Sequence, residues 1–330
     1  MEQISVEHVG GVTAGDLLRR AGARHGLREV WRLLKRDRFY YLLAALPLSY
    51  FLVFHYLPMF GIIIAFKNYD PYMGIQGILT EPWVGFTHFR NFFKSIYFVN
   101  VMRNTLTISF LKLIFGFPAP IILALLINEV RHLFFKRTVQ TISYLPHFFS
   151  MVVVAGMVRS VLTVQGGLLN QLVAAFGGQP RAFLTDPNLF RPILVVTDIW
   201  QGMGWGSILY LAAMTSISPE LYEAAMIDGA NKLQQIWYIT LPGISFVIAI
   251  TLIFRIGGLL NAGFEQILLL YSPAVYQVAD IIDTYVYRSG LLGRQYSYAA
   301  AVGLFKSITA MILLIIANRV AKWVGQPGIW

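Results

Sequence analysis

Six long apolar runs dominate this sequence of 330 residues. A transmembrane helix needs about 20 mainly apolar residues, and backbone polar groups in lipid must be satisfied within the segment, so each run should be helical. Composition agrees, because only 13% of the residues are charged, against about 25% in soluble proteins. The sequence therefore predicts an all-α, polytopic membrane protein with six transmembrane helices, near residues 40–65, 101–127, 142–163, 192–214, 243–263 and 299–323.

The positions of lysine and arginine predict which side of the membrane each loop faces. Cytoplasmic loops carry an excess of basic residues, so both termini and the loop after the fourth run are expected in the cytoplasm. The same clustering argues against nucleic acid as the partner of a chain with net charge +10, because a phosphate-binding surface would need that charge along one groove. The basic residues are Arg19, Arg20, Arg24, Arg28, Arg32, Lys35, Arg36 and Arg38 before the first run, Arg131, Lys136 and Arg137 after the second, and Arg319 and Lys322 at the end.

Residues 1–38 are expected to form a polar, basic tail ahead of a membrane domain that occupies 39–330. Within the tail, apolar residues recur at helical spacing beside basic ones, which predicts a short amphipathic helix at the cytoplasmic membrane surface. A disordered positive tail is the alternative interpretation. The apolar residues in question are Leu27, Val30, Trp31 and Leu34.

The segment between the fourth and fifth runs has the pattern E-A-A-x3-G-x9-I-x-L-P. Ser218 can cap a helix that starts at Pro219, and Gly229 can take the left-handed conformation that ends it. Residues 218–242 are therefore expected to form two short helices at an angle, before the next span begins at the final proline.

The chemistry of this loop indicates a surface for another protein. Ala224 and Ala225 are small enough for a groove to approach closely, and Glu223 offers that groove a carboxylate. Leu221, Met226, Ile227 and Ile236 supply apolar contacts. A plain amphipathic loop with chance Ala and Gly is the alternative. The candidate contact residues are Glu223, Ala224, Ala225, Asp228, Gly229, Ile239, Leu241 and Pro242.

The same loop resembles that of the permease subunits of carbohydrate-uptake ABC importers, the group that includes the maltose importer. The likeness covers most of the chain from about residue 39 and includes Asn104-Thr105-Leu106, residues 124–129 and residues 205–242. Residues 263–267 and 283–287 resemble the branch that handles oligosaccharides and polysaccharide fragments. Within that branch the chain is most similar to the permease of a bacterial alginate importer.

The resemblance implies a type I permease bundle in the bacterial inner membrane and a machine of several parts. Two permease subunits, usually different chains, form the pore. A pair of ATPase subunits binds the coupling loops from the cytoplasm, and a solute-binding protein delivers the sugar from outside. By position, Glu223 would meet a basic residue of the ATPase, and Gly229 would set the bend of the loop.

Nothing in the sequence suggests that this chain is itself an enzyme. It has no G-x4-G-K-[ST] loop for phosphates, no H-E-x-x-H spacing among its six histidines and no G-x-S-x-G elbow. Cysteine is absent. No cofactor or metal site is expected here, and ATP with magnesium would bind the partner ATPase. An ion-gradient-driven secondary sugar transporter is the alternative class, and it would not need a coupling loop.

Charged residues inside the apolar runs are candidates for the substrate path. Such charges cost roughly 2.5–3.5 kcal/mol at the centre of a membrane on insertion scales and usually face a watery cavity or a partner. Their excess over Asp198 suits an anionic substrate such as a uronate chain, although Arg255 could instead pair with that aspartate or with a partner permease, and Arg159 and Lys306 could reach the interface. The candidates are Arg255, Lys112, Lys306, Arg159 and Asn261, with Asn170 as a further sugar contact.

Overall fold

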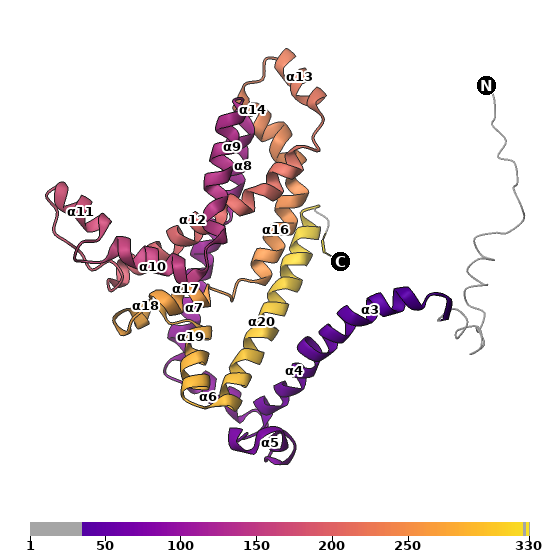
Figure 1. Ribbon diagram of the computed structural model, residues 1–330, viewed down its shortest axis with the longest axis vertical. Coiled ribbons are helices and arrows are strands. Elements are labelled where there is room, and N and C mark those ends of the chain that lie inside the picture. The colour runs from indigo at the N-terminus through magenta and orange to yellow at the C-terminus, as the bar shows by residue number, and fades with distance from the viewer. Residues whose placement is uncertain (1–34, 326–327, 330) are drawn as a thin grey trace, which may run out of the picture. The chain divides into compact units, whose positions relative to one another are not determined.

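The computed structural model describes residues 35–325 and 328–329 (Figure 1). The amphipathic helix expected around residues 27–34 lies outside the described residues. The chain divides between Gly61 and Ile62 into two units, so the expected boundary at residue 38 falls within the first. Nearly all described residues outside loops are helical, and the described part contains one isolated β-bridge, between Lys67 and Trp83.

The described part of the first unit belongs to a single apolar helical run. The run begins as α3 (Arg38–Phe51), passes through the π-turn η1 (Leu52–Tyr56) into α4 (Leu57–Met59), and continues into η2 (Phe60–Phe66), which extends past the end of the unit at Gly61. Only 6% of the most apolar window of Arg38–Phe66 is buried. A helix that is apolar on every face suits lipid or a partner helix rather than water.

The second unit holds the other helices. Its long ones are α7 (Phe98–Leu111), which continues through η4 (Lys112–Gly116) into α8 (Pro118–Glu129), α12 (Pro187–Met214) and α20 (Tyr296–Trp323). Those before α12 are η3 (Pro71–Met73), α5 (Gly74–Thr80), α6 (Thr87–Lys94), α9 (Leu133–Tyr144), η5 (Leu145–Phe148), α10 (Met151–Leu162) and α11 (Leu168–Ala175). Those after it are α13 (Pro219–Ile227), α14 (Lys232–Gln235), η6 (Ile236–Thr240), α15 (Leu241–Gly243), α16 (Ser245–Gly257), α17 (Phe264–Leu270), η7 (Pro273–Val275), α18 (Tyr276–Ala279), α19 (Ile282–Val286) and η8 (Tyr287–Leu292).

Three of the π-turns share a local cause. The turns η1, η4 and η6 each end two residues before a proline, namely Pro58, Pro118 and Pro242. A proline inside a helix lacks an N–H and crowds the carbonyl four residues earlier, which in each case belongs to the π-turn. Widening the helix there relieves the crowding, so α7, η4 and α8 run on as one helix of 32 residues.

The membrane spans differ in part from the six that the sequence predicts. Three described helices are long and apolar enough to cross a membrane, or up to five if each bent pair counts as one span. The bent pairs are Leu133–Phe148 with Met151–Leu162, at 103°, and Lys232–Gly243 with Ser245–Gly257, at 65°. The fourth predicted run lies in α12, which is long enough but is not among these spans, because glycines and polar residues lower its hydropathy.

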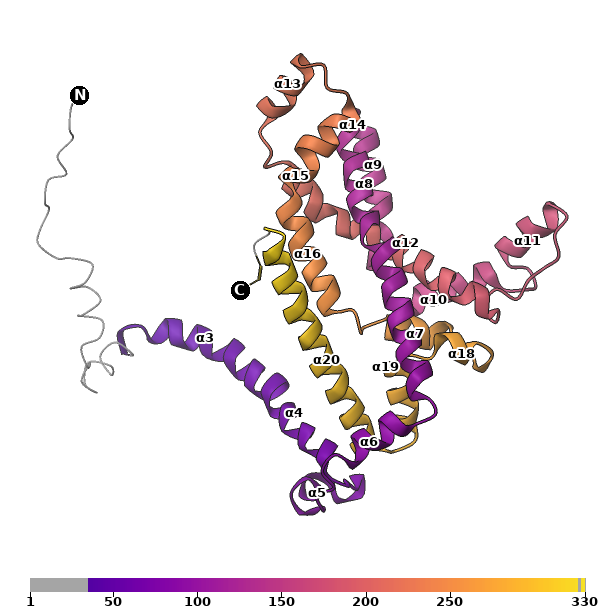
Figure 2. The ribbon, with the colours of Figure 1, turned by 180° about the vertical axis from the view of Figure 1, so that it is seen from behind.

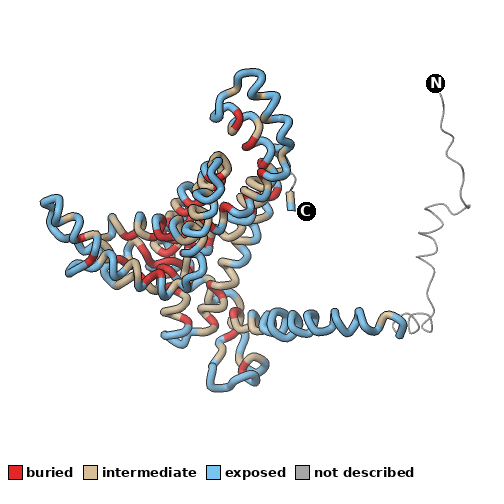
Figure 3. The backbone as a smooth tube through the Cα atoms, turned by 45° about the horizontal axis from the view of Figure 1, so that its top comes forward, coloured by how far each residue is buried: buried red, intermediate tan, exposed pale blue. Residues whose placement is uncertain are grey.

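The second unit packs around α12, which contacts α8 and α9. In both ribbon views α16 and α20 lie side by side (Figures 1 and 2). Buried residues gather at the centre of this unit, while its projecting loops are exposed (Figure 3). The crossing of α12 and α9 is close at Gly204, where an added Cβ would collide with the carbonyl of Ser143.

The segment 264–298, between the fifth and sixth predicted runs, is folded onto the bundle. Helices α17, α18 and α19 contribute Ile267, Ala279 and Ile282 to two buried apolar clusters. Those clusters also contain Ile108 and Val101 of α7. The segment is therefore part of the core that surrounds the charged groups described below.

Candidate functional site

The loop that carries the sequence pattern begins with helix α13. The backbone of Ser218 occupies the N-cap position and Pro219 the first helical position. The side chain of Ser218 makes no capping hydrogen bond, so the expected cap is confirmed in the backbone but not in the side chain. Glu220 stands in the first turn, where the positive end of the helix dipole favours a carboxylate.

Helix α13 ends in a left-handed turn at Gly229. Its φ is +80°, a region that a residue with a Cβ enters only at a cost. The N–H of Gly229 donates to the carbonyl of Met226 at 3.1 Å, and the N–H of Ala230 donates to that of Ala225 at 2.8 Å. This pair of bonds is a Schellman motif. The predicted end of the helix and the direction change at this glycine are thus both present.

The second arm of the loop starts from a capping box. Asn231 and Gln234 exchange side-chain and backbone hydrogen bonds of 3.0 and 2.7 Å across the start of α14. The hydroxyl of Tyr222 in α13 lies 3.0 Å from that of Thr240, which joins the two arms. These hydrogen bonds connect the two arms and fix the start of the second one, so the loop has a defined conformation.

The pattern residues divide into an outward group and an anchoring group. Glu223, Ala224 and Gly229 are exposed, as is Asp228, while Ala225 is half-buried. In the second group, Leu241 packs against a core cluster that includes Met214 and Ile244; Ile239 is half-buried and Pro242 exposed.

Helix α13 projects at one end of the second unit (Figures 1 and 2). It carries exposed apolar side chains, among them Ile227 at 87% exposure and Met226 at 54%. Apolar side chains grouped on a projecting loop mark a surface for another protein.

A group of charged side chains lies inside the bundle where η4, α12, α16 and α17 meet. Asp198 accepts from Lys112 Nζ at 3.1 Å through Oδ1 and from Arg255 Nη2 at 3.2 Å through Oδ2. Gln266 accepts from the same lysine at 2.6 Å and donates to the carbonyl of Leu194 at 3.0 Å. Two cations and one carboxylate leave this trio with one net positive charge. The pairing of Arg255 with Asp198, one of the alternatives from sequence, is therefore present.

Gly263 of the α16–α17 connection and Gly116 of η4 lie beside this trio. Gly263 has φ +96°, and an added Cβ there would clash with Lys112 Nζ. An added Cβ at Gly116 would make only ordinary van der Waals contact, at 3.5 Å, with Arg255 and Asp198. Of the two positions, it is therefore Gly263 where the close approach of the backbone to Lys112 favours a residue without a side chain.

A cavity of about 530 Å³ opens beside Asp198 and Arg255, and we call it the central cavity. Its wall includes His147 stacked on Trp205, with ring centroids 4.7 Å apart and planes 4° from parallel. A side cavity of about 70 Å³ borders the trio and is lined by Asn261 and Lys112. The central cavity thus combines a cation with flat apolar ring faces, the mix typical of small-molecule sites.

The remaining sequence candidates lie elsewhere. Lys306 forms an ion pair of 2.7 Å with Asp283, and Arg159 donates to the carbonyl of Leu269. Asn170 is buried and uses its amide to join residues 163 and 181. None of these side chains lines the central or the side cavity, and Arg159 borders a separate cavity of about 290 Å³.

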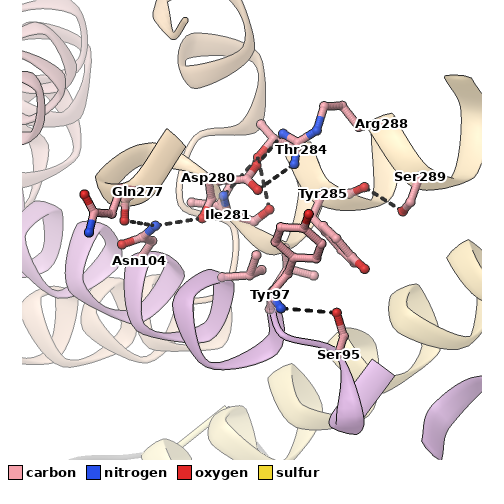
Figure 4. Close-up of polar contacts among 12 residues, drawn as sticks. Ser95, Tyr97, Asn104, Gln277, Asp280, Ile281, Thr284, Tyr285, Arg288 and Ser289 are labelled. Carbon is pink, nitrogen blue, oxygen red and sulfur yellow. Dashed lines mark hydrogen bonds and ion pairs between the residues drawn. The ribbon is translucent and has the colours of Figure 1, made fainter. Parts of the chain in front are cut away.

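The sequence reasoning missed a second polar cluster, at Asp280. Arg288 binds both oxygens of this buried carboxylate at 2.7 Å, and the bonds raise the pKa of Arg288 above its usual value. Asn104 of α7 donates to the backbone carbonyls of Gln277 and Asp280, both at 3.1 Å, as Figure 4 shows. Arg191 of α12 donates to Asn104 at 2.7 Å, so the cluster ties segment 264–298 to two helices.

No simple spacing in the sequence pointed to this cluster or to the stack of His147 on Trp205. Asp280 and Arg288 are eight residues apart across a helix start, and the stacked rings are 58 residues apart. Both depend on how the helices pack. The resemblance did single out Asn104, but not its partners.

Apolar helices, a projecting two-armed loop and a charged internal cavity together define a membrane subunit of a transport system. A family model described as "Binding-protein-dependent transport system inner membrane component" matches residues 116–326. The chain belongs to this family.

The similarity to known proteins extends beyond residues 116–326 and covers most of the chain. The "Polygalacturonan/rhamnogalacturonan transport system permease protein YteP" of Bacillus subtilis is 47% identical, over 90% of this chain and 92% of the relative. A crystal structure of a bacterial ABC transporter involved in the import of the acidic polysaccharide alginate contains a chain that is 44% identical, with a TM-score of 0.83 over 89% of this chain and 99% of that one. A second crystal structure, of the bacterial alginate ABC transporter in complex with an alginate pentasaccharide-bound periplasmic protein, gives 43% identity and the same TM-score over 91% and 99%.

Proposed function

We propose that this chain is one of two permease subunits of an ATP-driven importer of oligosaccharides or polysaccharide fragments that carry carboxylates. The observation that carries the proposal is the central cavity, where the half-exposed guanidinium of Arg255 faces a space large enough for a sugar unit beside stacked rings. The relatives named for polygalacturonan, rhamnogalacturonan and alginate transport support it.

The net positive charge of the trio supports an anionic substrate. A carboxylate that enters the central cavity would meet Arg255, whose side chain is 48% exposed, rather than Lys112, which is 7% exposed. Charge-assisted hydrogen bonds from a guanidinium to a carboxylate are among the strongest in proteins. Sugar rings can stack on the faces of His147 and Trp205, since aromatic faces pair with flat apolar surfaces.

The energy comes from a separate ATPase dimer, which binds ATP and magnesium. The outward group of the coupling loop, with Glu223 and exposed Met226 and Ile227, supports this contact. In this arrangement the loop and both termini face the cytoplasm of a bacterial inner membrane. A second permease subunit, a different chain, completes the pore, and a binding protein delivers substrate from the other side.

The test uses the complex reconstituted in lipid vesicles with both permeases, the ATPase and the binding protein. Oligogalacturonate and alginate oligosaccharides are compared with their carboxyl-reduced, neutral forms, and substrate-stimulated ATP hydrolysis is measured. We expect the acidic oligosaccharides to stimulate hydrolysis more strongly. Stimulation by the neutral forms alone would refute the acidic substrate, and uptake by the chain without ATP would favour a secondary transporter.

A further inference from the structure

Asp198 is shared by two cations, one more than neutrality requires. Lys112 approaches Oδ1 and Arg255 approaches Oδ2, at 3.1 and 3.2 Å. Each carboxylate oxygen therefore has its own cationic partner. Either cation alone would balance the charge of Asp198.

The two cations differ in what surrounds them. Lys112 belongs to the π-turn η4, is 7% exposed, and is also held by Gln266 at 2.6 Å. Among the two cavities it borders only the side cavity of about 70 Å³. Arg255 belongs to α16, is 48% exposed, and borders the central cavity. Lys112 is thus fixed and shielded, whereas Arg255 is accessible.

We infer that Lys112 is a positioning residue that neutralises Asp198 while Arg255 binds a carboxylate of the substrate. Before substrate enters, both cations bind Asp198. Afterwards Arg255 binds the substrate carboxylate and Lys112 keeps Asp198 paired, so no carboxylate is left without a cation. The trio, with one net positive charge, becomes neutral together with one substrate carboxylate. This inference rests on the proposed acidic substrate.

Without Lys112 the same exchange is unfavourable. Arg255 could reach the substrate only by leaving Asp198, which is 28% exposed, with no cationic partner. Leaving the half-buried carboxylate of Asp198 without a cation costs free energy. That cost is comparable to the free energy gained when Arg255 binds the substrate carboxylate. Lys112 therefore determines whether acidic substrates are accepted, although it does not touch them.

The test compares Lys112→Met with the double variant Lys112→Met/Asp198→Asn in the reconstituted complex. We expect Lys112→Met to lower uptake of oligogalacturonate about tenfold to hundredfold, the range for one lost charge-assisted hydrogen bond. In the double variant no carboxylate at position 198 can lose its cationic partner. Its uptake should therefore return to within about threefold of wild type, which is a smaller change than the loss of one charge-assisted hydrogen bond would cause. If Lys112 only supports packing through Gln266, the double variant will be as impaired as the single one, and the inference is wrong.

Asp198→Asn alone provides a second test if Lys112→Met does not assemble. An asparagine oxygen can still accept from Lys112, and Arg255 is released for the substrate. Half-saturation of uptake should then occur at a lower oligogalacturonate concentration than in wild type. A loss of acidic uptake in this variant would overturn the inference. If acidic oligosaccharides neither stimulate ATP hydrolysis by the wild-type complex nor are taken up by it, the proposed function is wrong. The failure of the inference and the failure of the proposed function are therefore distinguishable.

Discussion

The contacts of a charged residue in this chain indicate its role better than its residue type does. The four candidate cations of the predicted apolar runs, Lys112, Arg159, Arg255 and Lys306, have different surroundings in the structure. Lys306 is held by Asp283 and Arg159 by a backbone carbonyl, whereas Arg255 retains access to the central cavity. Charge inside an apolar run marks a candidate, but exposure and pairing decide among candidates.

Replacing Arg255 tests the cavity at this scale. Arg255→Ala should reduce uptake of oligogalacturonate at least tenfold, since about 1.5–3 kcal/mol is lost with a charged hydrogen bond, while Asp198 stays paired with Lys112. Uptake in vesicles and co-purification of the subunits are the measurements. Arg255→Lys, which keeps the charge, is the control. Unchanged uptake in the alanine variant would remove Arg255 from the substrate path.

Charge reversal at Glu223 tests the coupling loop. Glu223→Arg should reduce the amount of ATPase that co-purifies by tenfold or more, because facing like charges across an interface costs several kcal/mol, about enough for that loss. Glu220→Arg makes the same change in the same exposed helix and is the matched control. Equal retention of ATPase by both variants would contradict the assigned role of Glu223.

At the scale of elements, local sequence rules account well for the structure of the loop at 218–242. The proline start and the glycine end are found where the sequence predicts them, and the structure adds an asparagine cap at the second helix. The widened turns before Pro58, Pro118 and Pro242 also have a local cause. How α9 crosses α12 does not, because it depends on a glycine whose neighbour comes from another helix.

Alanine substitutions at Gly204 and Gly202 of α12 distinguish the effect of tight packing from the effect of helix propensity. Gly204→Ala should destabilise the protein by about 1–3 kcal/mol through overpacking, because its Cβ would collide with the carbonyl of Ser143. Gly202→Ala, in the same helix, has open space around the added methyl group. Thermal unfolding of the purified complex should show a lower transition for the first variant only; equal transitions would mean that the crossing is not tight.

At the scale of the whole molecule, the packing of segment 264–298 is the feature that the sequence predicts least. Apolar residues of its short helices enter the core, and its polar residues bind α7 and α12 through Asn104 and Arg191. The segment lies between two predicted apolar runs, and its fold places Gln266 against Lys112.

The Asp280 cluster should hold that segment in place. Arg288→Met leaves a carboxylate that is 5% exposed without its cation, and breaking such a pair costs about 3–5 kcal/mol. The unfolding free energy, measured by thermal or denaturant unfolding of the complex, should fall accordingly. Arg288→Met/Asp280→Asn should recover part of the loss. A single variant as stable as wild type would show that the pair does not stabilise the segment.

The sequence by itself determined the helical class, the apolar runs and the two-helix form of the loop at 218–242, because these follow from hydropathy and from backbone preferences of neighbouring residues. It also supplied the family, through the loop pattern and a likeness that covers most of the chain from about residue 39. Tertiary structure alone decided which charges pair, which one faces a cavity, and that His147 stacks on Trp205. Those outcomes join helices far apart in the chain, and side-chain pairing across such distances depends on packing geometry that no local rule contains.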